Sequence, residues 1–143
     1  MLAETLKNNG FKIYSGGTDT HLMLVDLRPF NVKGNIASES LSRANITCNK
    51  NGIPFDTEKP MITSGIRLGS QAATTRGFGL KEFEKVGELI TKVIKGLAEN
   101  PEDNSKVEEE VRNEVVSLCS NFPIYKNLNK WFAPVKKKVK LQL

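Results

Sequence analysis

Hydrophobic residues recur at helical spacing over two stretches in the second half of the chain. Residues three and four positions apart fall on one face of an α-helix. The first stretch contains Leu80, Phe83, Val86, Ile90, Val93, Ile94 and Leu97. The second contains Val107, Val111, Val115, Leu118, Cys119 and Phe122. The pattern therefore predicts two amphipathic helices, which are the longest elements expected in the chain.

Residues that stop or cap a helix predict where the first of these helices ends and where the second begins. Asn100-Pro101 ends the first stretch, because proline lacks the amide hydrogen that a helix interior needs. Ser105 and Glu108 have the spacing of a capping box, in which the hydroxyl and the carboxylate each accept a hydrogen bond from an unpaired amide. We therefore expect the second helix to begin at Ser105. We expect its first turn, including the acidic residues 108–110, to be solvated.

The first part of the chain has a shorter helical pattern followed by two strand patterns. Leucines one turn apart, followed by Asn9-Gly10, predict a helix over 1–9. Because the pattern starts inside a helix, we expect further sequence upstream. Alternation over 11–14 and an apolar run over 21–25 predict two strands that form a hairpin.

A second short helix is predicted over 36–44. Its expected apolar stripe consists of Ile36, Leu41 and Ala44. Residues 46–48 follow directly and predict a third strand, because they carry a β-branched pair before Cys48.

A long irregular loop is predicted over 49–60, where asparagine, glycine and proline are frequent. Long loops inside compact domains are often functional. Residues 62–69 then predict an extended segment interrupted by glycine. Together these elements indicate an α+β fold, with a small, mainly antiparallel sheet and helices packed on its outer side.

The composition is that of one globular domain. The chain has 143 residues, of which 38% are hydrophobic and 26% are charged. No apolar run approaches the roughly 20 residues that a membrane-spanning helix needs, so no membrane association is expected. Two cysteines, Cys48 and Cys119, are too few for a disulfide scaffold, and we expect both to lie in the core. A cytoplasmic location is therefore expected.

The net charge of +5 comes from the end of the chain. Residues 1–125 hold fifteen of the 21 basic residues and all 16 acidic residues, which leaves this part with a net charge of −1. A nucleic-acid partner is therefore not expected. The segment 126–143 is predicted to be a basic tail, whose Trp131 and Phe132 could dock on the domain.

Candidate chemistry is sparse, because the chain has a single histidine, His21. No set of residues has the spacing of a metal site, and none is predicted. Arg67 is the exception, since it lies within Thr63-Ser-Gly-Ile-Arg-Leu-Gly69. A planar guanidinium can hold a carboxylate through two parallel hydrogen bonds, and the small neighbours let a ligand approach the backbone. An anion contact and an ordinary surface salt bridge both remain open for Arg67.

Five segments in order along the chain closely resemble the C-terminal third of the serine hydroxymethyltransferase family. They are Ser15-Gly-Gly-Thr-Asp-Thr-His21, Leu24-Val-Asp-Leu27, Arg43-Ala-Asn-Ile-Thr-Cys-Asn-Lys-Asn51, Thr63-Ser-Gly-Ile-Arg-Leu-Gly69 and Thr75-Arg-Gly-Phe78. The resemblance covers about residues 1–125, and the segment 126–143 does not look like the usual family ending. It implies the small C-terminal domain of fold-type I pyridoxal-phosphate enzymes.

The resemblance also implies an activity. The family interconverts serine plus tetrahydrofolate with glycine plus 5,10-methylenetetrahydrofolate, and pyridoxal phosphate acts as the electron sink. The arginine that clamps the substrate carboxylate in the family corresponds to Arg67. The asparagine that contacts the folate pterin ring corresponds to Asn51, and Lys50 beside it is expected to help hold the anionic folate. The family assembles as homodimers or homotetramers.

The family's Schiff-base lysine and most of its cofactor contacts belong to a large domain that nothing in the chain matches. We therefore expect no catalytic residue here, no pyridoxal phosphate bound by this chain alone, and no useful activity of the isolated chain. The first hypothesis is that the chain is the C-terminal domain or a gene fragment of such an enzyme. The alternatives are a non-catalytic module that binds folate or another anion, and a decayed fragment without a function of its own.

Overall fold

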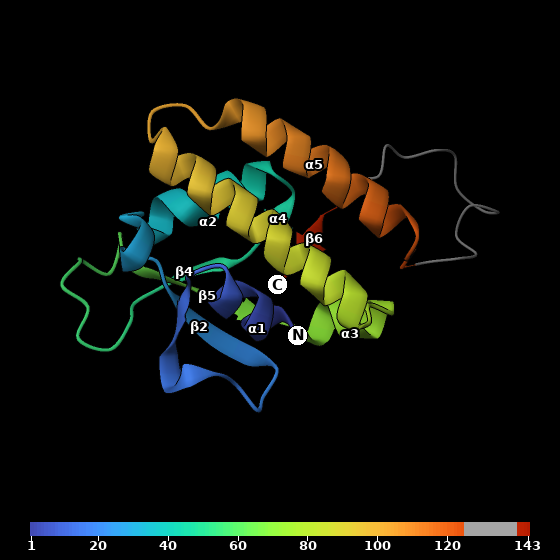
Figure 1. Cartoon of the computed structure of the whole chain (residues 1–143), viewed down its shortest axis with the longest axis horizontal. Helices are drawn as coiled ribbons and strands as arrows, with labels where there is room; N and C mark the ends of the chain where they lie inside the picture. Colours follow the sequence, from blue (N-terminus) through green and yellow to red (C-terminus); the bar gives the residue numbers. More distant parts are fainter. Residues whose placement is uncertain (125–139) are drawn as a thin grey trace.

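The computed structural model describes residues 1–124 and 140–143, and it shows helices covering one face of a small sheet (Figure 1). Four antiparallel strands form this sheet in the order β1-β2-β5-β4. They are β1 (Lys12–Ile13), β2 (Leu22–Asp26), β5 (Gly65–Gly69) and β4 (Asn49–Asn51). The predicted α+β class and the hairpin of the first two strands are confirmed.

The helices expected from the hydrophobic pattern are present. The structure has α1 (Leu2–Asn8), α2 (Gly34–Arg43), α3 (Gln71–Arg76), α4 (Leu80–Glu99) and α5 (Ser105–Ser120), with 3-10 turns η1 (Tyr14–Gly16) and η2 (Arg28–Phe30). Figure 1 shows α4 and α5 side by side above the sheet. No helix in residues 1–124 or 140–143 has the length and apolar character needed to cross a membrane.

The core lies between the sheet and α4. From the sheet, Val25, Ile66 and Leu68 are fully buried. From α4, Val86 and Ile90 are fully buried as well. Burial of such side chains contributes about 1.5–3 kcal/mol each, so this layer accounts for much of the stability of the domain.

Helices α1 and α4 contact each other closely at a glycine. A Cβ atom at Gly87 would lie 2.7 Å from Cγ2 of Thr5, so no larger residue fits at this position. The close contact holds α1 against the middle of α4.

Two predicted core positions are wrong. Ile36 is 42% exposed, and Leu80 is 68% exposed. In α2 the buried face is formed by Ala37, Ser40 and Leu41, which places Ile36 on the outer side. Leu80 is the first residue of α4, at the edge of the buried face that continues from Phe83.

The predicted capping box at the start of α5 is also wrong. The N-cap residue is Asn104, and the amide of Ser105 donates instead to Oδ1 of Asp103 at 2.9 Å. Glu108, expected in solvent, is only 4% exposed. Its carboxylate accepts hydrogen bonds from the Ser40 hydroxyl at 2.6 Å and from two guanidinium nitrogens of Arg43 at 2.7 Å. The side chain of Glu108 therefore joins α5 to α2 instead of capping its own helix.

The Arg43–Glu108 pair changes the ionisation of the carboxyl group. The hydrogen bonds from Arg43 lower the pKa of Glu108 below its usual value, against the effect of burial, and Ser40 adds to this lowering. Asn104 extends the network, since its amide nitrogen donates to the Ser40 hydroxyl at 3.2 Å and to the Val93 carbonyl at 3.0 Å. Helices α2, α4 and α5 thus meet at one polar cluster.

The predicted extended segment over 62–69 is confirmed by strand β5 from Gly65, whereas strand β4 was not expected and occupies the start of the predicted loop over 49–60. Helix α3 was not expected, because its six residues carry no apolar stripe. The third predicted strand is confirmed as β3 (Ile46–Thr47).

Strand β3 forms a second, two-stranded sheet with the end of the chain. It pairs in parallel with β6 (Leu141–Gln142), and Leu141 is 1% exposed. The suggested docking of Trp131 and Phe132 falls outside the described residues. The last three residues therefore contribute to the packed domain, although they follow the basic segment.

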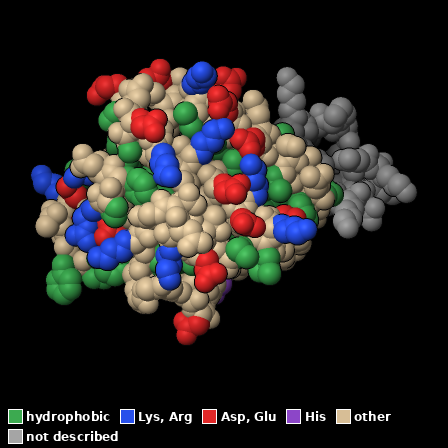
Figure 2. Space-filling model, viewed as in Figure 1, with side chains coloured by type: hydrophobic (Ala, Val, Ile, Leu, Met, Phe, Trp, Pro, Cys, Tyr) green, Lys and Arg blue, Asp and Glu red, His purple; other side chains and the backbone are tan. Residues whose placement is uncertain are grey.

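The charged side chains do not form a large patch of one sign on the face shown in Figure 2. Basic and acidic side chains are interspersed there over the helices. Ion pairs such as Lys85–Glu114 at 2.7 Å and Lys92–Glu110 at 3.0 Å join α4 to α5 on the surface. Exposed pairs of this kind contribute about 0–1 kcal/mol each.

Candidate functional site

Arg67 lies at the centre of β5, between two residues of the core. Ile66 and Leu68 are fully buried, whereas Arg67 is exposed. Because successive side chains of a strand point to opposite faces, Arg67 projects from the face of the sheet that the helices leave open. The core thus fixes the backbone of Arg67 from behind while its side chain reaches solvent.

The neighbours of Arg67 on this face do not neutralise its charge. Leu24 on β2 and Asn49 on β4 lie directly opposite it in the register of the sheet. Within the described residues, no hydrogen bond or ion pair joins the Arg67 guanidinium to another side chain. Arg67 therefore keeps its hydrogen-bond donors available, which an internal salt bridge would not allow.

Asn51 lies on the same open face as Arg67. It ends β4 and pairs with Gly65, two residues from the pair formed by Asn49 and Arg67. Diagonal neighbours at this spacing lie roughly 7–8 Å apart in an antiparallel sheet. The Asn51 amide nitrogen donates to the Gly52 carbonyl at 2.8 Å, which orients the side-chain amide. The structure thus brings the two predicted ligand contacts onto adjacent strands and the same face.

Lys50 is placed differently. It pairs with Ile66, and the alternation along β4 therefore assigns its side chain to the face opposite that of Asn51 and Arg67. Its side chain is partly buried at the edge of the sheet. A direct contribution of Lys50 to a ligand held by the other two residues stays a prediction.

The loop between Asn51 and Arg67 is organised by the carboxylate of Asp56. Oδ2 accepts hydrogen bonds from the amides of Ile53 at 3.1 Å and Ser64 at 2.9 Å. Oδ1 accepts from the Glu58 amide at 3.0 Å and from the Ser64 hydroxyl at 2.7 Å. Burial alone would raise the pKa of Asp56, but these hydrogen bonds outweigh burial and hold the pKa well below its usual value.

The end of this loop is also held by the start of α2. The amides of Gly34 and Asn35, which have no partner inside the helix, donate to the carbonyls of Thr63 and Ile62, each at 2.9 Å. A Cβ atom at Gly34 would lie 2.1 Å from the Thr63 hydroxyl oxygen and 2.4 Å from the Gly65 carbonyl oxygen. Gly34 is therefore required for this contact between the helix and the strand that carries Arg67.

A third contact fixes the loop at Pro54. The Tyr14 hydroxyl donates to the Pro54 carbonyl at 3.1 Å and accepts from Arg28 at 3.3 Å. Arg28 also holds the buried carboxylate of Asp26 through nitrogen–oxygen contacts of 3.0 and 2.7 Å. Burial alone would raise the pKa of Asp26, but the hydrogen bonds from Arg28 lower it below its usual value.

None of these supporting residues was predicted from the sequence. Tyr14 and Gly34 are far apart in the sequence from Pro54 and Thr63, the residues they hold. The partners of Asp56, in contrast, all lie two to eight residues away in its own loop. The available signal was local: an aspartate two residues after proline in a loop is typical of a side chain that accepts from backbone amides.

The residues around Arg67 do not fit pyridoxal phosphate on their own. Such a site needs a lysine amine, an acidic partner for the pyridine nitrogen and a phosphate cradle. The positions directly opposite Arg67 on the open face are occupied by Leu24 and Asn49, which supply neither an amine nor a carboxylate. Residues 1–124 and 140–143 likewise bring together no group of three potential metal ligands.

The two cysteines do not add reactive chemistry to this face. Burial raises the pKa of Cys48 to about 12 and also raises the pKa of Cys119, where the neighbouring Arg76 opposes the effect. Both thiols therefore stay protonated at neutral pH, where the thiolate needed for nucleophilic chemistry is scarce. Cys119 lies in the core as expected, whereas Cys48 is only partly buried.

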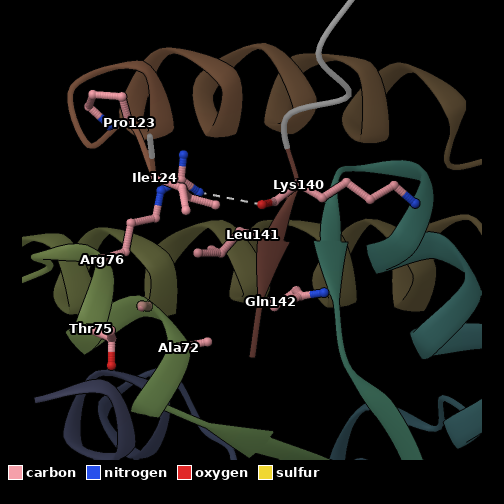
Figure 3. Close-up of a pocket in the computed structure, with 9 residues that line it drawn as sticks. Ala72, Thr75, Arg76, Pro123, Ile124, Lys140, Leu141 and Gln142 are labelled. Carbon is pink, nitrogen blue, oxygen red and sulfur yellow. Dashed lines mark hydrogen bonds between the residues drawn. The ribbon is translucent and has the colours of Figure 1, made fainter. Parts of the chain in front are cut away.

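A separate pocket lies between α3 and β6, away from Arg67 (Figure 3). Its volume is about 560 Å³, and Arg76 and Lys140 are on its wall. The Arg76 guanidinium donates to the carbonyls of Cys119 in α5 at 2.9 Å and of Phe122 just after α5, and to the Lys140 carbonyl at 3.5 Å. Because Arg76 binds these three carbonyls, its role is to join α3, α5 and β6.

Comparison with known proteins agrees with the resemblance in the sequence. The family model for serine hydroxymethyltransferase matches residues 1–90. A serine hydroxymethyltransferase of Pelagibacter ubique (strain HTCC1062) is 89% identical over 128 residues, which cover 90% of this chain and 29% of that protein.

More distant relatives give the same result. Serine hydroxymethyltransferases of Marinomonas sp. (strain MWYL1) and Paramagnetospirillum magneticum (strain ATCC 700264 / AMB-1) are 64% and 65% identical, respectively. Each match covers 87% of this chain and 29% of the relative. The chain therefore spans less than a third of the length of the curated relatives it matches.

Proposed function

The chain belongs to the serine hydroxymethyltransferase family, and from this premise we propose that it supplies the substrate-carboxylate and folate contacts of such an enzyme. The reaction of the complete enzyme would interconvert serine plus tetrahydrofolate with glycine plus 5,10-methylenetetrahydrofolate. The remaining part of the site, including pyridoxal phosphate and its lysine, would come from a large domain. Pyridoxal phosphate, when bound there, supplies the electron sink for the chemistry at the amino acid.

One observation carries this proposal. Arg67 projects from the open face of the sheet, and within the described residues its guanidinium has no internal carboxylate partner. A guanidinium in this position can bind the two oxygens of an amino-acid carboxylate through parallel hydrogen bonds. Because Ile66 and Leu68 fix the strand on both sides, the bound amino acid would be held in one orientation.

Asn51 is the proposed folate contact. Its side-chain amide offers both donors and an acceptor, which matches the edge of a pterin ring. Asn51 lies beside Arg67 on the same face, so one surface could present both substrates to the large domain. Lys50 is proposed only as a more distant charge for the anionic folate.

The proposed setting follows from the family. The partners would be the large domain, the amino-acid and folate substrates, and further copies of the same enzyme in a homodimer or homotetramer. The cytoplasm is the proposed location, and the free thiols of Cys48 and Cys119 are compatible with it. The isolated chain is proposed to be inactive.

The test is reconstitution. The full chain is mixed with the separately produced large domain of the Pelagibacter ubique relative, and serine cleavage is measured. We expect activity only in the mixture, and a large increase in KM for serine with Arg67→Ala. Full activity of that variant would remove Arg67 from its proposed role.

A second measurement distinguishes part of an enzyme from the alternative, a non-catalytic module that binds folate. Folate affinity is measured for the isolated chain and for Asn51→Ala. Tight binding that the substitution abolishes, together with an inactive mixture, would favour a folate-binding module over part of an enzyme.

A further inference from the structure

We propose that Asp56 is a positioning residue, which sets the distance between Arg67 and Asn51 by joining the two ends of the loop between their strands. This inference deepens the proposed function and rests on it for the roles of Arg67 and Asn51. The role of Asp56 is geometric, so amide exchange and NMR signals can test it without an activity assay.

The contacts of Asp56 lie close to both proposed ligand residues. Ile53, whose amide donates to Oδ2, is two residues after Asn51. Ser64, whose amide and hydroxyl donate to Oδ2 and Oδ1, is three residues before Arg67. One carboxylate therefore joins the exit of β4 to the entry of β5.

The connection through Asp56 is needed because β4 and β5 pair over only a short length within the sheet. Strand β4 has three residues, and its pairing with β5 ends at Asn51 and Gly65. A strand edge of this length frays readily unless the chain beyond it is held. The hydrogen bonds of Asp56 reach Ile53, two residues after Asn51, and Ser64, one residue before Gly65, so they extend the connection between the strands.

The chemistry of the group is specific to a carboxylate. All four contacts of Asp56 are donors: three backbone N–H groups and one hydroxyl. An asparagine has one acceptor oxygen, and its NH₂ group would face at least one N–H donor in either orientation. Hydrogen bonds to a charged group are also stronger than those to a neutral one. Asp56→Asn should therefore loosen the loop although it preserves the size of the side chain.

The backbone of the loop is held in an unfavourable conformation. Phe55 and Thr63 have positive φ angles of 58° and 62°. Such angles are uncommon for an aromatic residue and are strained for a β-branched one. Phe55 is 96% exposed, so packing of its side chain does not compensate for the strain. The hydrogen bonds of Asp56, directly after Phe55, hold this part of the loop, together with the contacts of Tyr14 at Pro54 and of Gly34 at Thr63.

The first experiment measures amide exchange by NMR on the full chain. In Asp56→Asn we expect exchange at Ile53, Glu58 and Ser64 to become about tenfold faster or more, because these amides lose a charged acceptor. The side-chain signals of Asn51 and Arg67 should shift. Amides in the middle of α4 should keep their protection, which shows that the domain is still folded.

Two further variants make the measurement decisive. Asp103→Asn is the matched control, because Asp103 also accepts from a serine amide but lies outside the loop. It should leave the loop unchanged. Ser64→Ala removes one of the four donors and should give a smaller change in the same direction. If Asp56→Asn does not fold, a folded Ser64→Ala with unchanged loop exchange and unchanged Asn51 and Arg67 signals overturns the proposal.

The second experiment uses the mixture with the large domain. Loss of positioning in Asp56→Asn should raise KM for both serine and tetrahydrofolate, each by about tenfold, whereas simple loss of folded protein would lower kcat alone. Unchanged KM values for both substrates would overturn the positioning role. An inactive wild-type mixture would instead contradict the proposed function, and the exchange data would still decide the role of Asp56.

Discussion

At the scale of single residues, the buried carboxylate of Glu108 depends on a few specific partners outside the candidate site. Arg43 provides two of its hydrogen bonds, and Ser40 provides the third. The local sequence predicts Glu108 in solvent, because the two residues after it are acidic and it has the spacing of a capping box with Ser105. Its actual partners lie 65 and 68 positions away, and local spacing carries no information about them.

Arg43→Ala should destabilise the domain by about 2–3 kcal/mol, because it leaves Glu108 buried with Ser40 as its remaining donor. The matched control is Lys85→Ala, which breaks an exposed ion pair with Glu114 and should cost no more than about 1 kcal/mol. Urea unfolding at neutral pH measures both. Equal effects of the two substitutions would contradict the importance of the buried pair.

The Arg43–Glu108 pair predicts that the folded domain becomes less stable in acid. The pKa of Glu108 is lowered in the folded state, so its contribution is present above the unfolded pKa of about 4.5 and is lost as pH falls through the lower folded value. Asp26 and Asp56 act in the same direction. We expect the urea midpoint to fall as pH is lowered from 5 to 3, roughly the range of these groups.

Arg43→Ala should reduce the slope of this pH dependence, because it removes the main cause of the lowered pKa of Glu108. An unchanged slope in the variant would assign the acid sensitivity to the other two carboxyl groups.

At the scale of elements, the sequence predicted the helices and strands in which the hydrophobic pattern repeats several times. Helix α4 has 20 residues and therefore presents its buried face over several turns. Strand β4 has three polar residues, and helix α3 has six residues, so neither shows a period. Both depend on tertiary pairing, which the order of residues does not reveal.

In the candidate site, too, residues that belong to local sequence motifs were predicted, whereas a residue that depends on folded contacts was not. Arg67 and Asn51 were predicted as ligand contacts because they belong to motifs that resemble a known family. Asp56 was not singled out, because its importance comes from four hydrogen bonds that form only in the folded loop.

Gly65 lies where β5 is enclosed by its two neighbouring strands, so its substitution is expected to destabilise the sheet. A Cβ atom there would lie 2.6 Å from Cγ2 of Ile53, 2.7 Å from the Val25 carbonyl oxygen and 3.0 Å from the Asn51 carbonyl oxygen. Backbone oxygens of two neighbouring strands cannot both move away, so Gly65→Ala should destabilise the domain by about 3 kcal/mol.

The control for this prediction is Gly17→Ala. Gly17 has extended backbone with φ of 173°, and no atom lies within 4 Å of its added Cβ. The thermal midpoint of Gly17→Ala should match that of the wild type. A similar loss of stability in Gly17→Ala and Gly65→Ala would show that the clash at Gly65 is not the cause.

At the scale of the whole molecule, the end of the chain is part of the core. Leu141 of β6 is 1% exposed beside β3, so Leu141→Ala should cost about 2–4 kcal/mol. Leu80→Ala is the matched control, because Leu80 is 68% exposed and its loss should change stability by about 0.5 kcal/mol or less. Thermal or urea unfolding separates the two outcomes.

Strand β5 alternates buried and exposed side chains along five residues, and this has a consequence for variation in the chain. Ile66 and Leu68 pack into the core, and Arg67 between them faces outward. A change that repacks Ile66 or Leu68 would tilt the guanidinium of Arg67 as well. A saturation library at the codons of Ile66 and Leu68 would therefore show few variants that lose recognition while retaining a native melting profile. Adaptation to a new ligand would have to proceed through those side chains of the loop and β4 that lie outside the core.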